Sequence, residues 1–201
     1  MTPWLIHSLP VLALVLSCCV HDDTSVPIDT QALQAGDLVV RRGLSVASRA
    51  VLAADSAATY SHMGIVVWRN GQWMVAHAVP GERDDGGPDT VKMDPLTHFF
   101  LPVRAARGAV ARVQASPSSR QRAANEAIAV VARHTTFDHH YNLHDTTALY
   151  CTELVIRCYA AAGINLEPTQ LRHVSLPGFE GDYAFPSQVL DNPKVTIIMN
   201  Y

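Results

Sequence analysis

The chain has 201 residues, of which 48% are apolar and 16% are charged, and its formal net charge is −3. This length and composition favour one folded domain with a proper core and exclude general disorder. Because the charge is mildly negative and the arginines are scattered, a nucleic-acid partner is not expected.

An apolar run from Trp4 to Val20 opens the sequence. It has about the length of the apolar region of a signal peptide and is short for a membrane-spanning helix. The run ends in Val15-Leu16-Ser17-Cys18, which resembles the lipobox of bacterial lipoproteins, so Cys18 is the predicted lipidation site and Cys19 the alternative. We therefore expect export to the bacterial cell envelope and a membrane anchor on the periplasmic side. A buried N-terminal helix is the competing interpretation.

The chain accordingly divides into an export signal (1–19), a polar linker (20–32) and one domain (33–201). Within the domain the apolar patterns predict an α+β fold, with a small antiparallel sheet packed with helices. Strands are predicted at 38–40, 63–68, 73–79, near 110–113 and at 195–199. Helices are predicted at 44–54, 116–134 and 150–162, and loops at 80–89, 135–149 and 174–183. Ser116 and Pro117 are typical of a helix N-cap and first helical position, and Gly163 is typical of a helix end.

The dipeptide Asn70-Gly71 predicts a two-residue hairpin turn between two β-rich runs. With that turn, His77 faces Gly64 and His62 faces Val79. Alternate residues of a strand share a face, so the two histidines project from the same face as diagonal neighbours, about 7–8 Å apart at the backbone. Two imidazoles are therefore predicted to meet, and Gly64 leaves room for His77. The competing interpretation is that a backbone carbonyl satisfies each ring separately.

A cysteine lies near the start of the 150–162 helix, shortly after three residues that favour helix N-caps: Asp145, Thr146 and Thr147. The dipole and unpaired N–H groups of a first helical turn stabilise a thiolate and can hold an oxyanion, so we predict a lowered pKa for Cys151. Cys158 lies two turns further on, about 10 Å away, which is beyond disulfide reach. It is predicted to be an inert buried thiol.

Three segments resemble the signature of the permuted NlpC/P60 (papain-like) amidases of the YaeF/YiiX type. They are Gly36-Asp37-Leu38-Val39-Val40, Tyr60-Ser61-His62-Met63-Gly64-Ile65-Val66-Val67 and Tyr150-Cys151-Thr152-Glu153-Leu154-Val155. In this permuted group the histidine strands precede the cysteine helix, which is the order found here. The third polar residue of the family, often acidic, corresponds to His77. The resemblance runs from about Gly36 to Val195 and implies a circularly permuted papain-like NlpC/P60 fold.

The resemblance also implies a thiol mechanism, in which Cys151 is the nucleophile, His62 is its base and His77 orients His62. The expected reaction is cleavage of an amide or related acyl bond through a thioacyl intermediate, with a peptidoglycan peptide or an acyl lipid as substrate. No cofactor is expected.

Three further residues are candidates for substrate binding. Tyr60 and Tyr150 flank the two key residues, and Asp37 belongs to the first resembling segment. Packing explains the two tyrosines equally well.

Three alternatives to a hydrolase remain open. His139, His140 and His144 cluster, and the last two have the spacing of zinc ligands on a helix, but the neighbouring residues disfavour a helix and no HExxH glutamate lies between them. We therefore predict no metal site. Related permuted folds include lecithin:retinol acyltransferase-like enzymes, in which the thioacyl group passes to another nucleophile. A lipoprotein that binds an envelope ligand without activity is the third alternative.

Overall fold

The computed structural model describes residues 28–82, 86–143, 145, 147–176 and 179–201. The predicted export signal, Cys18 and Cys19, and most of the predicted linker lie outside the described residues, as does His144. Within the described ranges no helix is long and apolar enough to cross a membrane.

Six antiparallel strands form the central sheet, in the order β10-β5-β1-β2-β3-β4. Their bounds are β1 Leu38–Gly43, β2 His62–Arg69, β3 Gln72–Ala78, β4 Val91–Pro95, β5 Ala105–Val113 and β10 Val195–Asn200. The helices are α1 Val46–Ala54, α2 Leu96–Phe99, α3 Pro117–Ala132, α4 Cys151–Ala161 and α5 Pro186–Leu190. Two small sheets complete the fold: β6 Thr136–Phe137 with β7 Ala148–Leu149, and β8 Arg172–Leu176 with β9 Phe179–Tyr183.

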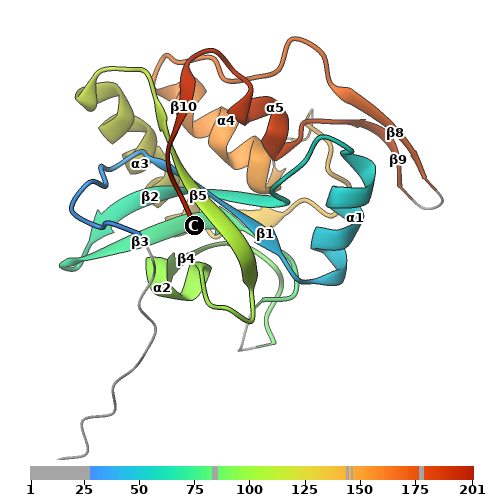
Figure 1. The fold of residues 1–201 in the computed structure, drawn as a ribbon, viewed down its shortest axis with the longest axis horizontal. Helices are drawn as coiled ribbons and strands as arrows, with labels where there is room; N and C mark the ends of the chain where they lie inside the picture. The colour runs from blue at the N-terminus through green and yellow to red at the C-terminus, as the bar shows by residue number, and fades with distance from the viewer. Residues whose placement is uncertain (1–27, 83–85, 144, 146, 177–178) are drawn as a thin grey trace, which may run out of the picture.

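The central sheet is covered on both faces. Helices α3 and α4 lie on one face, and the short helix α2 lies on the other (Figure 1). Alternation along β2 serves both layers, because Met63 and Ile65 join the core beneath α3 and α4, whereas Val66 joins the core around α2. Helix α1 and the β8–β9 hairpin lie together at one end of the molecule (Figure 1).

The predicted hairpin turn is confirmed. Asn70 and Gly71 both have positive φ angles, of 52° and 77°, as a type I′ turn requires. The β2–β3 pairing has the predicted register from Arg69 with Gln72 to Ile65 with Ala76. The β2–β3 ladder ends at the Ile65–Ala76 pair. Beyond it, β2 pairs with β1 and β3 pairs with β4, so the expected pairs of Gly64 with His77 and of His62 with Val79 lie outside the ladder.

Helix α3 begins as predicted, since the side chain of Ser116 accepts a hydrogen bond from the Ser119 N–H and Pro117 is the first helical residue. Helix α4 is found where it was predicted, one residue shorter at each end, but its N-cap is Tyr150 rather than one of the three polar residues upstream. Asp145 instead accepts hydrogen bonds from the backbone and hydroxyl of Thr147, within the preceding loop.

The prediction of a loop at 174–183 is wrong, because β8 and β9 pair as an antiparallel hairpin. Gly181, which suggested a loop, lies within β9 and pairs with Val174. Such short strands are stabilised by cross-strand partners, which a five-residue pattern does not reveal. The elements β4, α2 and α5 and the two-residue strands β6 and β7 were not predicted.

Gly64 offers a test of the packing behind the two histidines. A Cβ at this position would lie 2.6 Å from Val75 Cγ1, 2.8 Å from the Ala76 carbonyl oxygen and 3.0 Å from His77 Cβ. We expect Gly64→Ala to lower the free energy of unfolding by about 1–3 kcal/mol, measured by chemical denaturation, because an overpacked site must shift. The control Gln72→Ala, at an exposed strand end, should change it by no more than about 0.5 kcal/mol. Equal effects would contradict this packing.

Candidate active site

Cys151 is the first residue of α4, so its thiol lies at the N-terminus of that helix, as predicted. Burial raises the pKa of the Cys151 thiol, and hydrogen bonds from the Thr152 hydroxyl and from the backbone N–H groups of Met63, Thr152 and Cys151 act in the opposite direction. The predicted lowering of this pKa is therefore wrong in sign. The helix N-terminus contributes as expected, but desolvation of the charged form outweighs it.

The two histidines of the hairpin meet as predicted. His62 Nε2 lies 2.9 Å from His77 Nδ1, and the ring centroids are 5.1 Å apart. Both rings also pack against Phe99 of α2, with centroid distances of 5.5 and 5.2 Å. The pair is buried: His62 is 4% exposed and His77 is 0% exposed.

Asp94 extends this pair, and the sequence reasoning did not find it. On the edge strand β4, its Oδ2 atom lies 3.1 Å from His77 Nε2. Burial acts to raise the pKa of Asp94, but hydrogen bonds and charges from His77 and Lys92 outweigh it and hold the pKa below its usual value. The carboxylate is therefore ionised and accepts the hydrogen bond. Asp94 could have been found from the sequence only if strand β4 and its pairing with β3 had been predicted.

The contacts determine which ring nitrogens carry protons. An ionised carboxylate only accepts, so His77 Nε2 is the protonated atom and the neutral ring leaves Nδ1 as an acceptor. His62 Nε2–H then donates to it. In neutral His62 the remaining nitrogen, Nδ1, carries a free lone pair. The chain from Asp94 to His62 thus leaves one defined atom, His62 Nδ1, able to take a proton.

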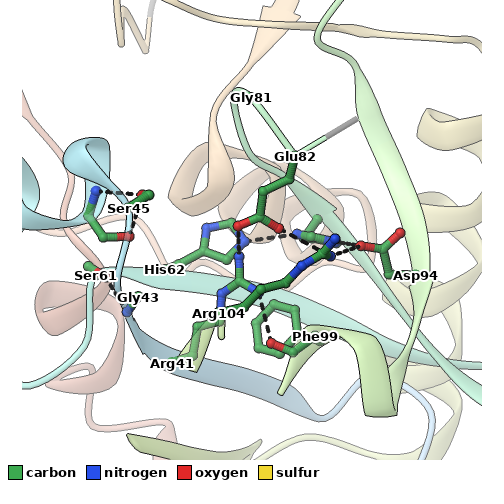
Figure 2. A network of polar contacts seen from close by, with 12 residues as sticks. Arg41, Gly43, Ser45, Ser61, His62, Gly81, Glu82, Asp94, Phe99 and Arg104 are labelled. Carbon is green, nitrogen blue, oxygen red and sulfur yellow. Dashed lines mark hydrogen bonds and ion pairs between the residues drawn. The ribbon is translucent and has the colours of Figure 1, made fainter. Parts of the chain in front are cut away.

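An ionic cluster surrounds the outer end of this chain (Figure 2). Arg104 lies 3.3 Å and Lys92 lies 2.9 Å from the same Oδ2 atom of Asp94. Arg41 is buried beside them, donates to the Phe99 carbonyl oxygen at 2.8 Å and pairs with the Glu82 carboxylate. Arg104 and Lys92 thus bind the same carboxylate oxygen that accepts the hydrogen bond from His77.

Both histidines are kept neutral. Burial lowers the pKa of His62 well below 6.5, and the charges of Arg41, His77 and Lys92 act in the same direction. Burial also lowers the pKa of His77, against the opposing effect of Asp94. At neutral pH the pair is therefore uncharged, and His62 is free to act as a base.

Cys151 and His62 line one cavity of about 30 Å³, together with Ser61, Val79 and Phe137. A second cavity of about 20 Å³ also borders Cys151 and shares Val51, Ser61 and Tyr141 with the first. No direct hydrogen bond joins Cys151 to the His62 ring among the contacts of the described residues. The structure therefore brings the sulfur and the first histidine to one space, with His77 and Asp94 behind.

The three candidate substrate-binding residues have different positions. Tyr150 lines the second cavity, and its hydroxyl accepts a hydrogen bond from the Ala184 N–H at 3.2 Å. The Tyr60 hydroxyl lies 3.2 Å from Asn200 Oδ1, and Tyr60 lines neither cavity. Asp37 lies at the far end of β1 from the histidines, where Arg112 binds its carboxylate through two nitrogens at 2.7 Å.

The other thiol and the histidine cluster lie apart from this site. Cys158 is unpaired and fully buried, and burial raises its pKa to about 12, as expected of an inert thiol. His139 lies 3.6 Å from Asp89 near the surface, and the backbone N–H of His140 binds Asp138. Among the described residues, no three His, Cys, Asp or Glu side chains are placed to hold a metal ion.

A thiol at a helix N-terminus, beside a sheet histidine whose ring is oriented by a further polar chain, is the arrangement of papain-like cysteine hydrolases. The chain belongs to the permuted papain-like amidases, the YaeF/YiiX or C92 family, whose model matches residues 32–196. It is therefore a cysteine hydrolase of the amidase kind. In the sequence analysis the fold was named NlpC/P60, but that name belongs to a different family of the papain-like group.

A solved structure supports the same fold. The chain is 26% identical to YiiX of Escherichia coli O157:H7, which is described as a metalloprotein, with a TM-score of 0.66. The similarity covers 84% of this chain and 97% of YiiX. The comparison with curated proteins finds no match. The permuted papain-like α+β fold that was expected from the motifs is confirmed.

Asp94→Asn tests the orienting chain. The amide presents an oxygen or an NH₂ group to His77 Nε2, so the tautomer of the pair is no longer determined. We expect kcat to fall about tenfold or more with little change in KM, since general-base catalysis contributes roughly 10²–10⁴-fold in all. Asp94→Glu should recover part of the loss. Glu126→Gln removes an exposed ion pair on α3 and should leave kcat unchanged; a comparable loss there would contradict the assignment.

The protonation states predict an unusual pH profile for alkylation of the free protein by iodoacetamide. Because the pKa of Cys151 is raised above 9 and that of His62 is lowered below 6.5, both groups are neutral between these values. Reactivity of Cys151 should therefore rise through and beyond pH 9, without a plateau at pH 5–7. A plateau in that acidic range would indicate a preformed thiolate–imidazolium pair and would contradict these states.

Proposed function

We propose that Cys151 is the nucleophile of an acyl-bond hydrolase, that His62 is its general base and acid, and that His77 orients His62. The observation that carries the proposal is the cavity lined by both Cys151 and His62, with His77 hydrogen-bonded behind. A neutral thiol and a neutral base side by side favour proton transfer that accompanies the attack.

The proposed reaction has two steps. In the first, His62 Nδ1 takes the proton of Cys151, the sulfur bonds to the carbonyl carbon, and the leaving group departs with that proton. In the second, water attacks the thioester, the carbon–sulfur bond breaks and the proton returns to the sulfur through His62. The backbone N–H groups near Sγ, from Cys151, Thr152 and Met63, are donors for the oxyanion of each intermediate.

The bond attacked is an amide or a related acyl bond. We place the protein in the bacterial cell envelope, exported and held at the membrane through lipidated Cys18, because of the apolar run and lipobox-like sequence at its N-terminus. A peptidoglycan peptide and a lipid amide are the two substrates that this location supports. Transfer of the acyl group to another nucleophile, and ligand binding without chemistry, are the alternative functions.

Two cysteine variants test the proposal. We expect a thiol-reactive probe, located by mass spectrometry of the peptide that contains residue 151, to label the wild-type protein and Cys158→Ala at Cys151 and to leave this peptide of Cys151→Ala unlabelled, because of the two described cysteines Cys151 is the one that borders a cavity beside a base. Hydrolysis of amide substrates should be lost in Cys151→Ala by a factor of at least about 10³. Products are identified by mass spectrometry, which separates hydrolysis from transfer. A wild-type protein that is neither labelled nor active would instead favour the binding function.

A further inference from the structure

The two cavities beside Cys151 are lined by apolar and aromatic side chains together with uncharged polar ones, which include Ser45, Ser48, Ser61 and Thr152. Among the described residues that line them there is no lysine, arginine, aspartate or glutamate. Aromatic residues line both cavities: Phe137, Tyr141, Tyr150, Tyr183 and Phe185. The nearest member of the orienting chain, His62, is itself kept neutral.

Apolar side chains also lie on the surface next to the two cavities. Ser45 lines the first cavity, and its neighbours Leu44 and Val46 are 44% and 74% exposed. On the other side, Val51 and Ala54 of α1 pack against the cluster of Val174, Tyr183 and Phe185. The surface beside the first cavity therefore carries exposed apolar side chains next to the hydroxyls of Ser45 and Ser48.

The cavities are small, with about 30 and 20 Å³ of space, enough for about one or two water molecules each. An acyl group larger than this reaches Cys151 when the walls of these cavities move apart. Helix α1 itself has no buried residue, but its end is fixed to β8 and α5 through the buried carboxylate of Asp55, which binds Arg172 and accepts a hydrogen bond from Ser187. The group that enters displaces apolar contacts and forms new ones with the same side chains.

This lining discriminates between the two proposed substrates. A carboxylate or amine carried into such walls loses its hydration and finds no counter-charge among the described lining residues. An uncharged hydrocarbon chain gains from each methylene that it buries. We infer that the acyl group transferred to Cys151 is apolar and uncharged, as in a lipid amide or ester, rather than the charged peptide of peptidoglycan. The inference rests on the proposed function.

Acylation by activated esters tests the inference directly, because it depends little on the leaving group. Purified protein is mixed with p-nitrophenyl acetate, butyrate and hexanoate, and with the p-nitrophenyl half-ester of adipic acid, which has the length of hexanoate but ends in a carboxylate. We expect the second-order rate constant for Cys151 acylation to rise roughly fourfold per methylene from acetate to hexanoate. The adipate half-ester should react at least about tenfold more slowly than hexanoate.

Val51 provides the matched variants, since it lines both cavities and is only partly buried on α1. Val51→Lys supplies the missing counter-charge and should shift the hexanoate-to-adipate ratio by about tenfold or more towards adipate. Val51→Met has a similar reach without charge and should keep the wild-type preference.

The outcomes separate the inference from the function on which it rests. Equal rates for hexanoate and adipate, a preference for adipate, or failure of hexanoate to acylate a Cys151 that iodoacetamide still alkylates would each overturn the inference. Cleavage of peptidoglycan fragments that requires Cys151, without acylation by hexanoate, would overturn it and leave the hydrolase intact. A Cys151 that is neither acylated nor alkylated would remove the proposed function itself.

Discussion

The register of the β2–β3 hairpin is the constraint on which the site depends. The Asn70-Gly71 turn places the strands so that His62 and His77 project from the same face, near the end of the ladder. A shift of one residue would turn one ring to the opposite face, where the core beneath α3 and α4 lies. The type I′ turn therefore determines how the two rings are placed, although it lies at the opposite end of the hairpin from them.

A second constraint is the charge placed around the buried rings. Arg41 is fully buried beside His62, is paired with Glu82 and stacks on Phe99, with its guanidinium carbon 4.7 Å from the ring centroid. A fixed positive charge in this position opposes protonation of His62 and so keeps its base nitrogen free. The cost of burying an arginine is offset by its carboxylate and carbonyl partners. The ionic cluster and the neutral histidines are thus parts of one electrostatic arrangement.

Local sequence signals predicted many of the elements that build the site, but not the residues whose roles depend on partners distant in the sequence. The turn dipeptide and the Ser116 cap act through their own neighbours, so their consequences were predictable. Asp94 was missed because its role exists only once β4 pairs with β3. The sign of the Cys151 pKa shift was wrong for the same reason: the sulfur is buried among side chains from segments far apart in the sequence, including Phe137 and Phe185. Their joint effect is absent from any local pattern.

The use of histidine where the family often has a carboxylate has a physical consequence. A carboxylate in direct contact with His62 would raise the pKa of its ring and favour imidazolium in the resting site. With His77 between them, the carboxylate of Asp94 still determines the tautomer through two hydrogen bonds, but its charge lies one ring further away. The His62 ring is thereby oriented through hydrogen bonds without a carboxylate charge in direct contact with it. In the proposed mechanism His62 is aligned as in a triad, yet it remains neutral beside the neutral thiol of Cys151, because walls without charged side chains disfavour a resting ion pair.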